Sequence, residues 1–115
     1  MPKNAKVFMV DDFEPNRSVV RRFLEDAGHV VKVEASAVDE ALGKIEEVKK
    51  EGVNVAVLDN SLGSGGNGST IAAALREEIP SIKIVSFSAL EDLKWADVPV
   101  VKPDLKKLVE AVTDI

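Results

Sequence analysis

Hydrophobic and polar positions divide the chain into short apolar runs and longer amphipathic segments. The apolar runs are rich in Val, Ile and Phe, which predicts β-strands because β-branched and aromatic side chains pack well on a pleated surface. There are five such runs: Lys6–Val10, Val30–Glu34, Asn54–Leu58, Lys83–Phe87 and Val98–Val101. Several of them are apolar at consecutive positions, which predicts strands that are buried on both faces.

The segments between the runs carry apolar residues at helical spacing. They are Pro15–Ala27, a segment that Ser36 can cap and that continues through Val48, one around Ile71 and Leu75 that ends before Pro80, and one from Leu105 to Val112. Gly28 and Gly52 follow the first two segments, where glycine commonly ends a helix. Strands that alternate with helices predict an α/β fold, a doubly wound parallel sheet covered on both faces.

Composition limits the possible functions. At 115 residues the chain predicts one domain, residues 1–115. The net charge of −5 argues against nucleic acid and anionic membrane as partners, because phosphate binding needs clustered Lys and Arg. With no cysteine and one histidine, a metal would have to be bound by oxygen atoms. No stretch approaches the roughly 20 apolar residues of a membrane span, and the N-terminus lacks the apolar core of a signal peptide, so we expect a cytoplasmic protein.

Charged and polar residues follow four of the predicted strands. Beyond the carboxyl ends of parallel strands, where ligands bind in open sheets, stand Asp11 and Asp12, Asp59, Ser88 and Lys102. Adjacent carboxylates stay ionised together only if a cation joins them, and an all-oxygen set suits Mg²⁺ with a phosphate. One acid at a strand end is more often a solvated turn residue or a helix cap. Four strand ends that each carry a residue of the same mechanism favour a functional site.

This set of residues is suited to phosphoryl transfer, in which the protein mainly positions groups and neutralises developing charge. Asp59 is the candidate nucleophile, because a carboxylate can attack phosphorus as in aspartyl-phosphate enzymes. Lys102 offers a compact positive charge to a phosphate oxygen, and Ser88 offers a hydroxyl donor. The acidic pair would then bind the Mg²⁺.

Four sequence motifs resemble the receiver domain of two-component response regulators. They are "VFMVDDFEPNRSVVRRFLEDAGHVV", similar to the first strand, acidic pair and first helix of that family, "VAVLDNSL", similar to its phosphoacceptor strand, "IVSFSA", and "VVKP". The resemblance covers nearly the whole chain and implies a flavodoxin-like fold with strand order 2-1-3-4-5. It also implies a response regulator that acts in phosphorelay signal transduction.

The resemblance implies a role for each acidic residue. Asp11 and Asp12 bind Mg²⁺, the second directly, and Asp59 and the backbone carbonyl of Ser61 complete the metal site. Asp59 accepts a phosphoryl group from a phosphohistidine on a histidine kinase or phosphotransfer protein. The protein would be a signalling switch that catalyses its own phosphorylation and dephosphorylation.

Two further implications concern the phosphate and the partner. Ser88 and Lys102 hold the phosphate, and the peptide bond between Lys102 and Pro103 is usually cis in the family. Surface residues of the first helix, such as Pro15 and Asn16, lie where kinases usually dock.

Two features depart from the family pattern. Only nine residues, 89–97, separate Ser88 from the last strand, too few for a full helix that crosses back over about 16 Å of sheet. We predict that the fourth helix of the family is reduced to a turn or strap. Pro99 replaces a switch Tyr or Phe, and proline suits only an edge strand or a strand start. We therefore expect phosphorylation to leave the helix Leu105–Val112 nearly unchanged and the protein to be a monomer.

Other interpretations stay open. A pseudo-receiver, a phosphorylation-independent protein-interaction module, would keep the fold without phosphate chemistry, and the intact acidic set argues against it. A phosphatase of the haloacid dehalogenase type needs an acid where the chain has Ser61. The run Gly63–Gly68 fits G-x-G-x-x-G, but it starts four residues after Asp59 rather than at the strand end, which disfavours a nucleotide site. Trp95 is expected to pack the short strap rather than to be an exposed anchor for a partner, and His29 to lie in a surface turn.

Overall fold

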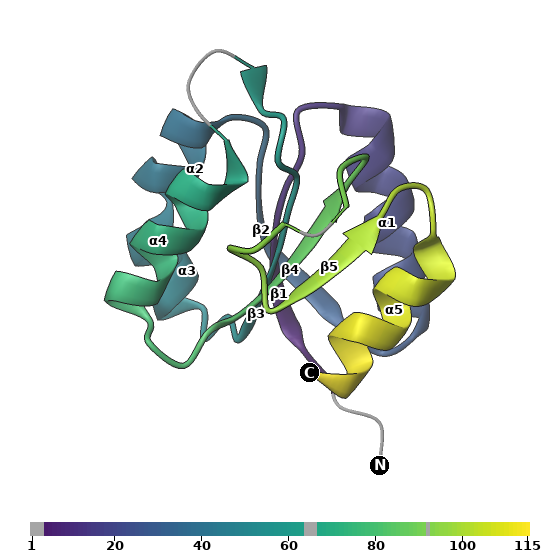
Figure 1. Ribbon diagram of the computed structural model, residues 1–115. Helices are drawn as coiled ribbons and strands as arrows, with labels where there is room; N and C mark the ends of the chain where they lie inside the picture. Colours follow the sequence, from purple (N-terminus) through teal and green to yellow (C-terminus); the bar gives the residue numbers. More distant parts are fainter. Residues whose placement is uncertain (1–3, 64–66, 92) are drawn as a thin grey trace.

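A five-stranded parallel sheet forms the centre of the protein in a computed structural model that describes residues 4–63, 67–91 and 93–115. The strand order is β2-β1-β3-β4-β5, and every neighbouring pair is parallel. Helices cover both faces of the sheet (Figure 1). The predicted doubly wound, flavodoxin-like architecture with strand order 2-1-3-4-5 is thereby confirmed.

The bounds of the elements follow the hydrophobic pattern closely. The strands are β1 (Lys6–Val10), β2 (Val30–Ala35), β3 (Val55–Leu58), β4 (Lys83–Ser88) and β5 (Val98–Val101). The helices are α1 (Glu14–Asp26), α2 (Val38–Gly43), α3 (Ile45–Lys50), α4 (Gly68–Glu78) and α5 (Leu105–Asp114). The five predicted strands are confirmed, and no predicted strand end differs from the observed one by more than one residue.

The predicted second helix is two helices in the structure. Lys44 separates α2 from α3 with φ −104° and ψ 3°, and it follows Gly43, a weak helix former. The expectation that Ser36 caps this helix is wrong, because Ala37 is the N-cap residue and makes no side-chain cap. Ser36 instead donates from its backbone N–H and its hydroxyl to Oε1 of Glu40, at 2.6 Å and 2.9 Å.

The sheet separates two clusters of buried apolar residues. Successive residues of a strand point to opposite faces, so each strand contributes to both clusters. Helices α2, α3 and α4 cover the face that carries Phe8, Val10, Ala56, Leu58 and Ile84. Helices α1 and α5 cover the opposite face, which carries Val7, Met9, Val55, Val57 and Val85 (Figure 1). Burial on both faces explains why these strands are apolar at consecutive positions.

The connection between β4 and β5 is not helical in any of its described residues, 89–91 and 93–97. Its second part, residues 93–97, is called the strap below. The reduction of the fourth family helix is therefore confirmed. Trp95 of the strap packs against the cluster under α2, α3 and α4, as predicted. β5 is an edge strand, which explains how it accommodates Pro99 opposite Ser86 of β4.

His29 contradicts its sequence prediction. Its side chain is buried, with 2% of its surface exposed, although it follows the turn at Gly28. The backbone N–H of Ala5 donates to Nδ1 at 2.9 Å, and Nε2 lies 3.0 Å from Oγ1 of Thr113. Thr113 lies 84 positions further along the chain, so only the packing of α5 beside the start of β2 brings the two residues together.

Candidate functional site

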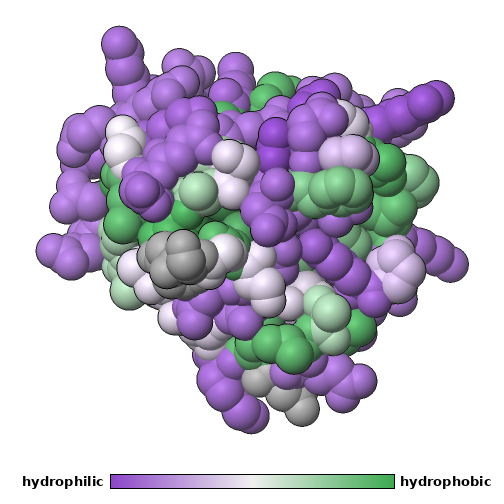
Figure 2. Space-filling view, turned by 90° about the horizontal axis from the view of Figure 1, so that it is seen from above, coloured by the Kyte–Doolittle hydropathy of each residue, from purple (hydrophilic) through white to green (hydrophobic). Residues whose placement is uncertain are grey.

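The three predicted acids meet at the carboxyl edge of the sheet. Val10 and Leu58, the last residues of β1 and β3, are paired in register, so Asp11, Asp12 and Asp59 follow at neighbouring positions. One carboxylate oxygen from each acid lies within 4.8 Å of the others. Figure 2 looks onto this end of the molecule and shows mainly hydrophilic residues, with separate groups of hydrophobic ones between them.

The acids differ in burial. Asp11 and Asp59 are 5% and 6% exposed, whereas Asp12 is exposed to solvent. The backbone N–H of Phe13 donates to Oδ1 of Asp11 at 2.9 Å, which fixes that carboxylate in the turn after β1. The backbone N–H of Ser61 lies 3.4 Å from Oδ1 of Asp59, a long hydrogen bond. The site therefore has two carboxylates held against the protein and one that faces water.

Lys102 lies between the two buried acids. Its Nζ donates to Oδ2 of Asp11 at 2.8 Å and to Oδ2 of Asp59 at 3.0 Å. The backbone N–H of Lys102 donates to the carbonyl oxygen of Ser88 at 2.8 Å, which continues the pairing of β5 with β4 up to the site. The next peptide bond, Lys102–Pro103, is cis, as the resemblance implied.

Burial and charge act in opposite directions on the two titrating groups at the centre. Burial raises the pKa of Asp59, and the hydrogen bond and charge of Lys102 only partly oppose it. Burial by itself lowers the pKa of Lys102, but its hydrogen bonds to Asp11 and Asp59 outweigh that effect and leave the pKa raised. The ammonium therefore stays charged between the two carboxylates at neutral pH.

The acidic set fits a divalent cation. The three carboxylates and one ammonium of the cluster leave an excess of two negative charges. Carboxylate oxygen atoms are the ligands that Mg²⁺ prefers. Ser61 lies beside the site through its contact with Asp59, and its carbonyl as a fourth ligand stays a prediction. Asp12 is the acid among them that solvent reaches most easily.

Ser88 ends β4 at the same edge of the sheet, with 2% of its surface exposed. Its hydroxyl oxygen accepts a hydrogen bond from the backbone N–H of Leu90 at 3.3 Å, a long contact. The hydroxyl is therefore only weakly engaged within the protein. The structure brings Asp11, Asp12, Asp59 and Lys102 into one cluster, with Ser88 on the neighbouring strand end.

Arg17 is a site residue that sequence reasoning missed. Its Nη1 donates to the backbone carbonyl of Asp11 at 2.7 Å, and its Nε lies 3.5 Å from Oε1 of Glu34 in β2. The guanidinium therefore ties α1 and β2 to the turn that carries the acidic pair. Its position in the first turn of the predicted helix was the available signal, but a backbone carbonyl as partner leaves no trace in a sequence.

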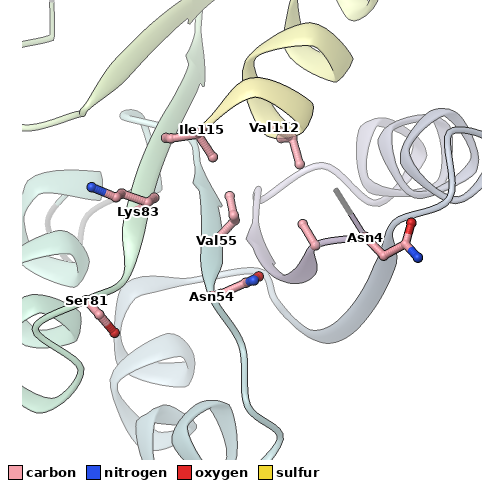
Figure 3. A pocket seen from close by; sticks show the side chains of 8 residues that line it. Asn4, Asn54, Val55, Ser81, Lys83, Val112 and Ile115 are labelled. Atoms are coloured by element: carbon pink, nitrogen blue, oxygen red, sulfur yellow. The ribbon is translucent and has the colours of Figure 1, made fainter. Parts of the chain in front are cut away.

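Two cavities help to delimit the site. One of about 320 Å³ lies at the opposite end of the sheet, and Asn54, Val55 and Lys83 line it together with α5 (Figure 3). None of the predicted site residues lines it. Another, of about 210 Å³, lies between α1 and the start of α5, and Lys102 contributes to its wall along with Val19. This second cavity thus joins the acidic site to the surface of α1.

The glycine-rich run Gly63–Gly68 is described only in part, because residues 64–66 lie outside the described residues. Gly63 has φ +80°, a conformation that favours glycine, and Gly68 is the first residue of α4. Asn67 caps α4 by accepting a hydrogen bond from the backbone N–H of Ser69 at 2.9 Å.

Among the helices described, none is long and apolar enough to span a membrane.

Comparison with known proteins gives a consistent result. A family model described as the response regulator receiver domain matches residues 7–112. A search among curated proteins finds no match. A two-component response regulator of the LuxR family from an Aurantimonas species is a similar solved structure, with 26% identity and a TM-score of 0.82. The match covers 96% of this chain and 83% of that chain.

Two more distant structures share the fold. A CheY-like response regulator receiver domain protein from Methanospirillum hungatei has 23% identity and a TM-score of 0.81, covering 97% of this chain and 93% of its own. The CheX–CheY complex with BeF₃ and Mg²⁺ from Borrelia burgdorferi contains a chain with 20% identity and a TM-score of 0.84. That match covers 96% of this chain and 87% of the other.

Proposed function

The chain belongs to the response regulator receiver domain family, and on this premise we propose that it is a signalling protein whose phosphoacceptor is Asp59. The observation that carries the proposal is the cluster at the end of β3. A buried carboxylate lies within 4.8 Å of two other acids and 3.0 Å from an ammonium group. A structural acid would not need this surplus of negative charge, whereas a nucleophile that works with a cation does.

The reaction transfers a phosphoryl group to an oxygen of Asp59. That carboxylate oxygen attacks phosphorus, the P–N bond of a phosphohistidine breaks, and the released imidazole nitrogen keeps the electron pair and takes up a proton. Lys102 lies 3.0 Å from Oδ2 of Asp59, so its ammonium can balance the charge of the incoming phosphoryl oxygens. Ser88 would donate its weakly engaged hydroxyl to another of these oxygens.

The metal site is part of the proposal. Asp11, Asp12 and Asp59, with the carbonyl of Ser61, would hold Mg²⁺, which supplies positive charge to the phosphoryl oxygens when it is bound. Lys102 bridges Asp11 and Asp59 in the structure, so a phosphate on Asp59 would have to draw the ammonium away from Asp11. Asp11 would then turn to the metal, and the local charge would stay balanced.

The partner is proposed to be a histidine kinase or phosphotransfer protein that docks beside α1. Large apolar side chains are exposed there: Phe13 is 56% exposed, and Val19 and Phe23 are 44% exposed. Val19 also lines the cavity that reaches Lys102, so a partner on this surface would lie next to the acceptor. Substitution of Val19 with Asp should weaken transfer from the partner while leaving transfer from a small phosphodonor unchanged.

Incubation with acetyl phosphate and Mg²⁺, followed by intact mass measurement, tests the function. We expect the mass gain of one phosphoryl group in the wild-type protein, and none in Asp59→Asn, in Asp12→Ala or with excess chelator. Asp39→Asn, which removes an exposed acid of α2, is the matched control and should react like the wild type. A mass gain that persists in Asp59→Asn would contradict the assignment. Complete lack of reaction in all conditions, with no response to beryllium fluoride, would support the pseudo-receiver instead.

A further inference from the structure

An indole ring and a glycine meet beside the backbone of Asp59. A Cβ atom added to Gly68 would lie 2.5 Å from the carbonyl oxygen of Asp59, and 2.7 Å and 2.8 Å from Cη2 and Cζ2 of Trp95. Such contacts are too short for a real side chain, so the close approach requires glycine. The backbone N–H of Gly68 also donates to the carbonyl of Asn60 at 3.2 Å. The first residue of α4 is thus packed between the end of the acceptor strand and the indole.

Contacts of the strap with α4 and β4 hold Trp95 in place. Arg76 of α4 donates from Nη1 to the carbonyl of Trp95 at 2.6 Å, and its Nη2 lies 3.2 Å from Oδ2 of Asp97. Asp97 in turn binds β4, because its Oδ2 accepts from the backbone N–H of Ile84 at 2.7 Å and its own N–H donates to Ile84 at 2.8 Å. The strap is therefore anchored to α4 and to β4 at Trp95 itself and two residues after it.

The edge strand offers no comparable link. Pro99 of β5 has a small closed ring that cannot rotate between two packed positions, and its neighbour in register is Ser86. By contrast, Trp95 has a large rigid indole ring that two rotatable bonds can reorient. The ring contacts Gly68, which lies against the backbone of Asp59. Protein interiors are close-packed, so a displacement of tenths of an ångström at Asp59 reaches Gly68 and then the indole.

We propose that Trp95 is a positioning residue for the phosphoacceptor: through Gly68 it holds the backbone of Asp59 and Asn60, and it transmits the occupation of Asp59 to the strap. The proposal rests on the proposed function of Asp59 and adds a second residue and an output surface to it. The strap then responds to phosphorylation in place of the family helix that is missing between β4 and β5, and α5 does not take part. Trp95 contacts no reacting atom, so its role is to set the geometry of the residue that does.

Intrinsic fluorescence provides a direct measurement, because Trp95 is the one tryptophan of the chain. Beryllium fluoride with Mg²⁺ should change the emission of the wild-type protein and leave that of Asp59→Asn unchanged. Trp95→Phe keeps an aromatic ring against the core but removes Cη2 and Cζ2, the atoms nearest to Gly68. We expect it to be phosphorylated by acetyl phosphate about tenfold more slowly, since small misplacements of a reacting group are costly. Lys94→Ala, at the exposed neighbour in the strap, should react at the wild-type rate.

The possible outcomes separate this inference from the function on which it rests. The wild-type protein can gain a phosphoryl group while beryllium fluoride leaves its emission unchanged, or while Trp95→Phe reacts within about twofold of the wild type. Either result would overturn the role of Trp95 and leave the phosphoacceptor assignment intact. If the wild-type protein gains no phosphoryl group and its amide chemical shifts around Asp59 do not respond to beryllium fluoride, the proposed function itself fails. Should Trp95→Phe not fold, the emission of the wild-type protein still decides the question.

Discussion

The surplus of negative charge at the site predicts that two substitutions change stability in opposite directions. One ammonium pairs with two of the three clustered carboxylates, and the oxygen atoms of the acids lie within 4.8 Å of one another. Asp12→Asn removes the exposed acid, which has no ion pair among the described residues. Lys102→Met removes the cation that binds the two buried acids. In the absence of Mg²⁺ we expect the first change to stabilise the folded protein and the second to destabilise it.

The magnitudes follow from these distances. Two unit charges at 4.8 Å repel by about 1 kcal/mol in a water-like dielectric and by about 3.5 kcal/mol at an effective dielectric constant of 20. Asp12 is repelled by two carboxylates and attracted by one ammonium, so the net effect is about that of one repulsion. Because Asp12 is exposed to solvent, the value for a water-like dielectric applies. Asp12→Asn should therefore raise the free energy of unfolding by about 1 kcal/mol. Lys102→Met leaves two carboxylates without a cationic partner, with 7% and 8% of their side chains exposed, and should lower the free energy of unfolding by about 3 kcal/mol.

Urea denaturation with and without Mg²⁺ measures both effects. A cation that binds only the folded state adds about 1.4 kcal/mol to the stability at ten times its dissociation constant. The wild-type protein should gain this stabilisation, and Asp12→Asn should gain much less of it because a proposed ligand is lost. The stabilities of these two proteins should therefore change order when Mg²⁺ is added. Asp39→Asn, which removes an exposed acid of α2 that is not part of the acidic cluster, controls for the general effect of net charge.

Two results would refute the reasoning. If Asp12→Asn is less stable than the wild type in the absence of Mg²⁺, Asp12 makes a favourable contact and the site carries no electrostatic strain. If Mg²⁺ stabilises Asp12→Asn and the wild type equally, the cation binds elsewhere or without Asp12.

Three further predictions concern residues outside the acidic cluster. Burial lowers the pKa of His29 below its usual 6.5, so the unfolded chain takes up the proton first and the free energy of unfolding falls as the pH drops below about 6.5. His29→Gln should reduce this loss between pH 7.5 and 5.5 in urea titrations. The hydroxyl of Ser86 is buried without a hydrogen-bond partner in the described structure, so Ser86→Ala should raise the unfolding free energy by about 1 kcal/mol, whereas a decrease would indicate an unseen partner. Gly28→Ala, at φ +96°, should lower the thermal midpoint, and Gly43→Ala, in open space on α2, should raise it.

Local pattern was sufficient for most of the fold. Consecutive apolar residues in β1, β3 and β4 predicted buried strands, since a strand covered on both faces needs no polar side. The length of the connection between β4 and β5 alone predicted that it is not a full helix, because nine residues cannot form a helix that crosses the sheet. The meeting of the candidate site residues was also predictable, since parallel strands end at a common edge, and whatever follows Val10, Leu58 and Val101 must lie there.

Contacts between distant segments were decided by the tertiary structure alone. The ammonium of Lys102 lies between acids that are 91 and 43 positions away in the chain, and its choice of Asp11 over Asp12 depends on the turn after β1. The burial of His29, the contact of Arg17 with a backbone carbonyl, and the approach of Trp95 to Gly68 depend in the same way on how elements pack. Hydrophobic periodicity reports which face of an element is buried. The hydrophobic effect that buries this face depends on its apolar area and not on the direction of any contact. The periodicity carries no information about which partner lies across that face, since partners are selected by distances and angles that exist only after the sheet and helices have assembled.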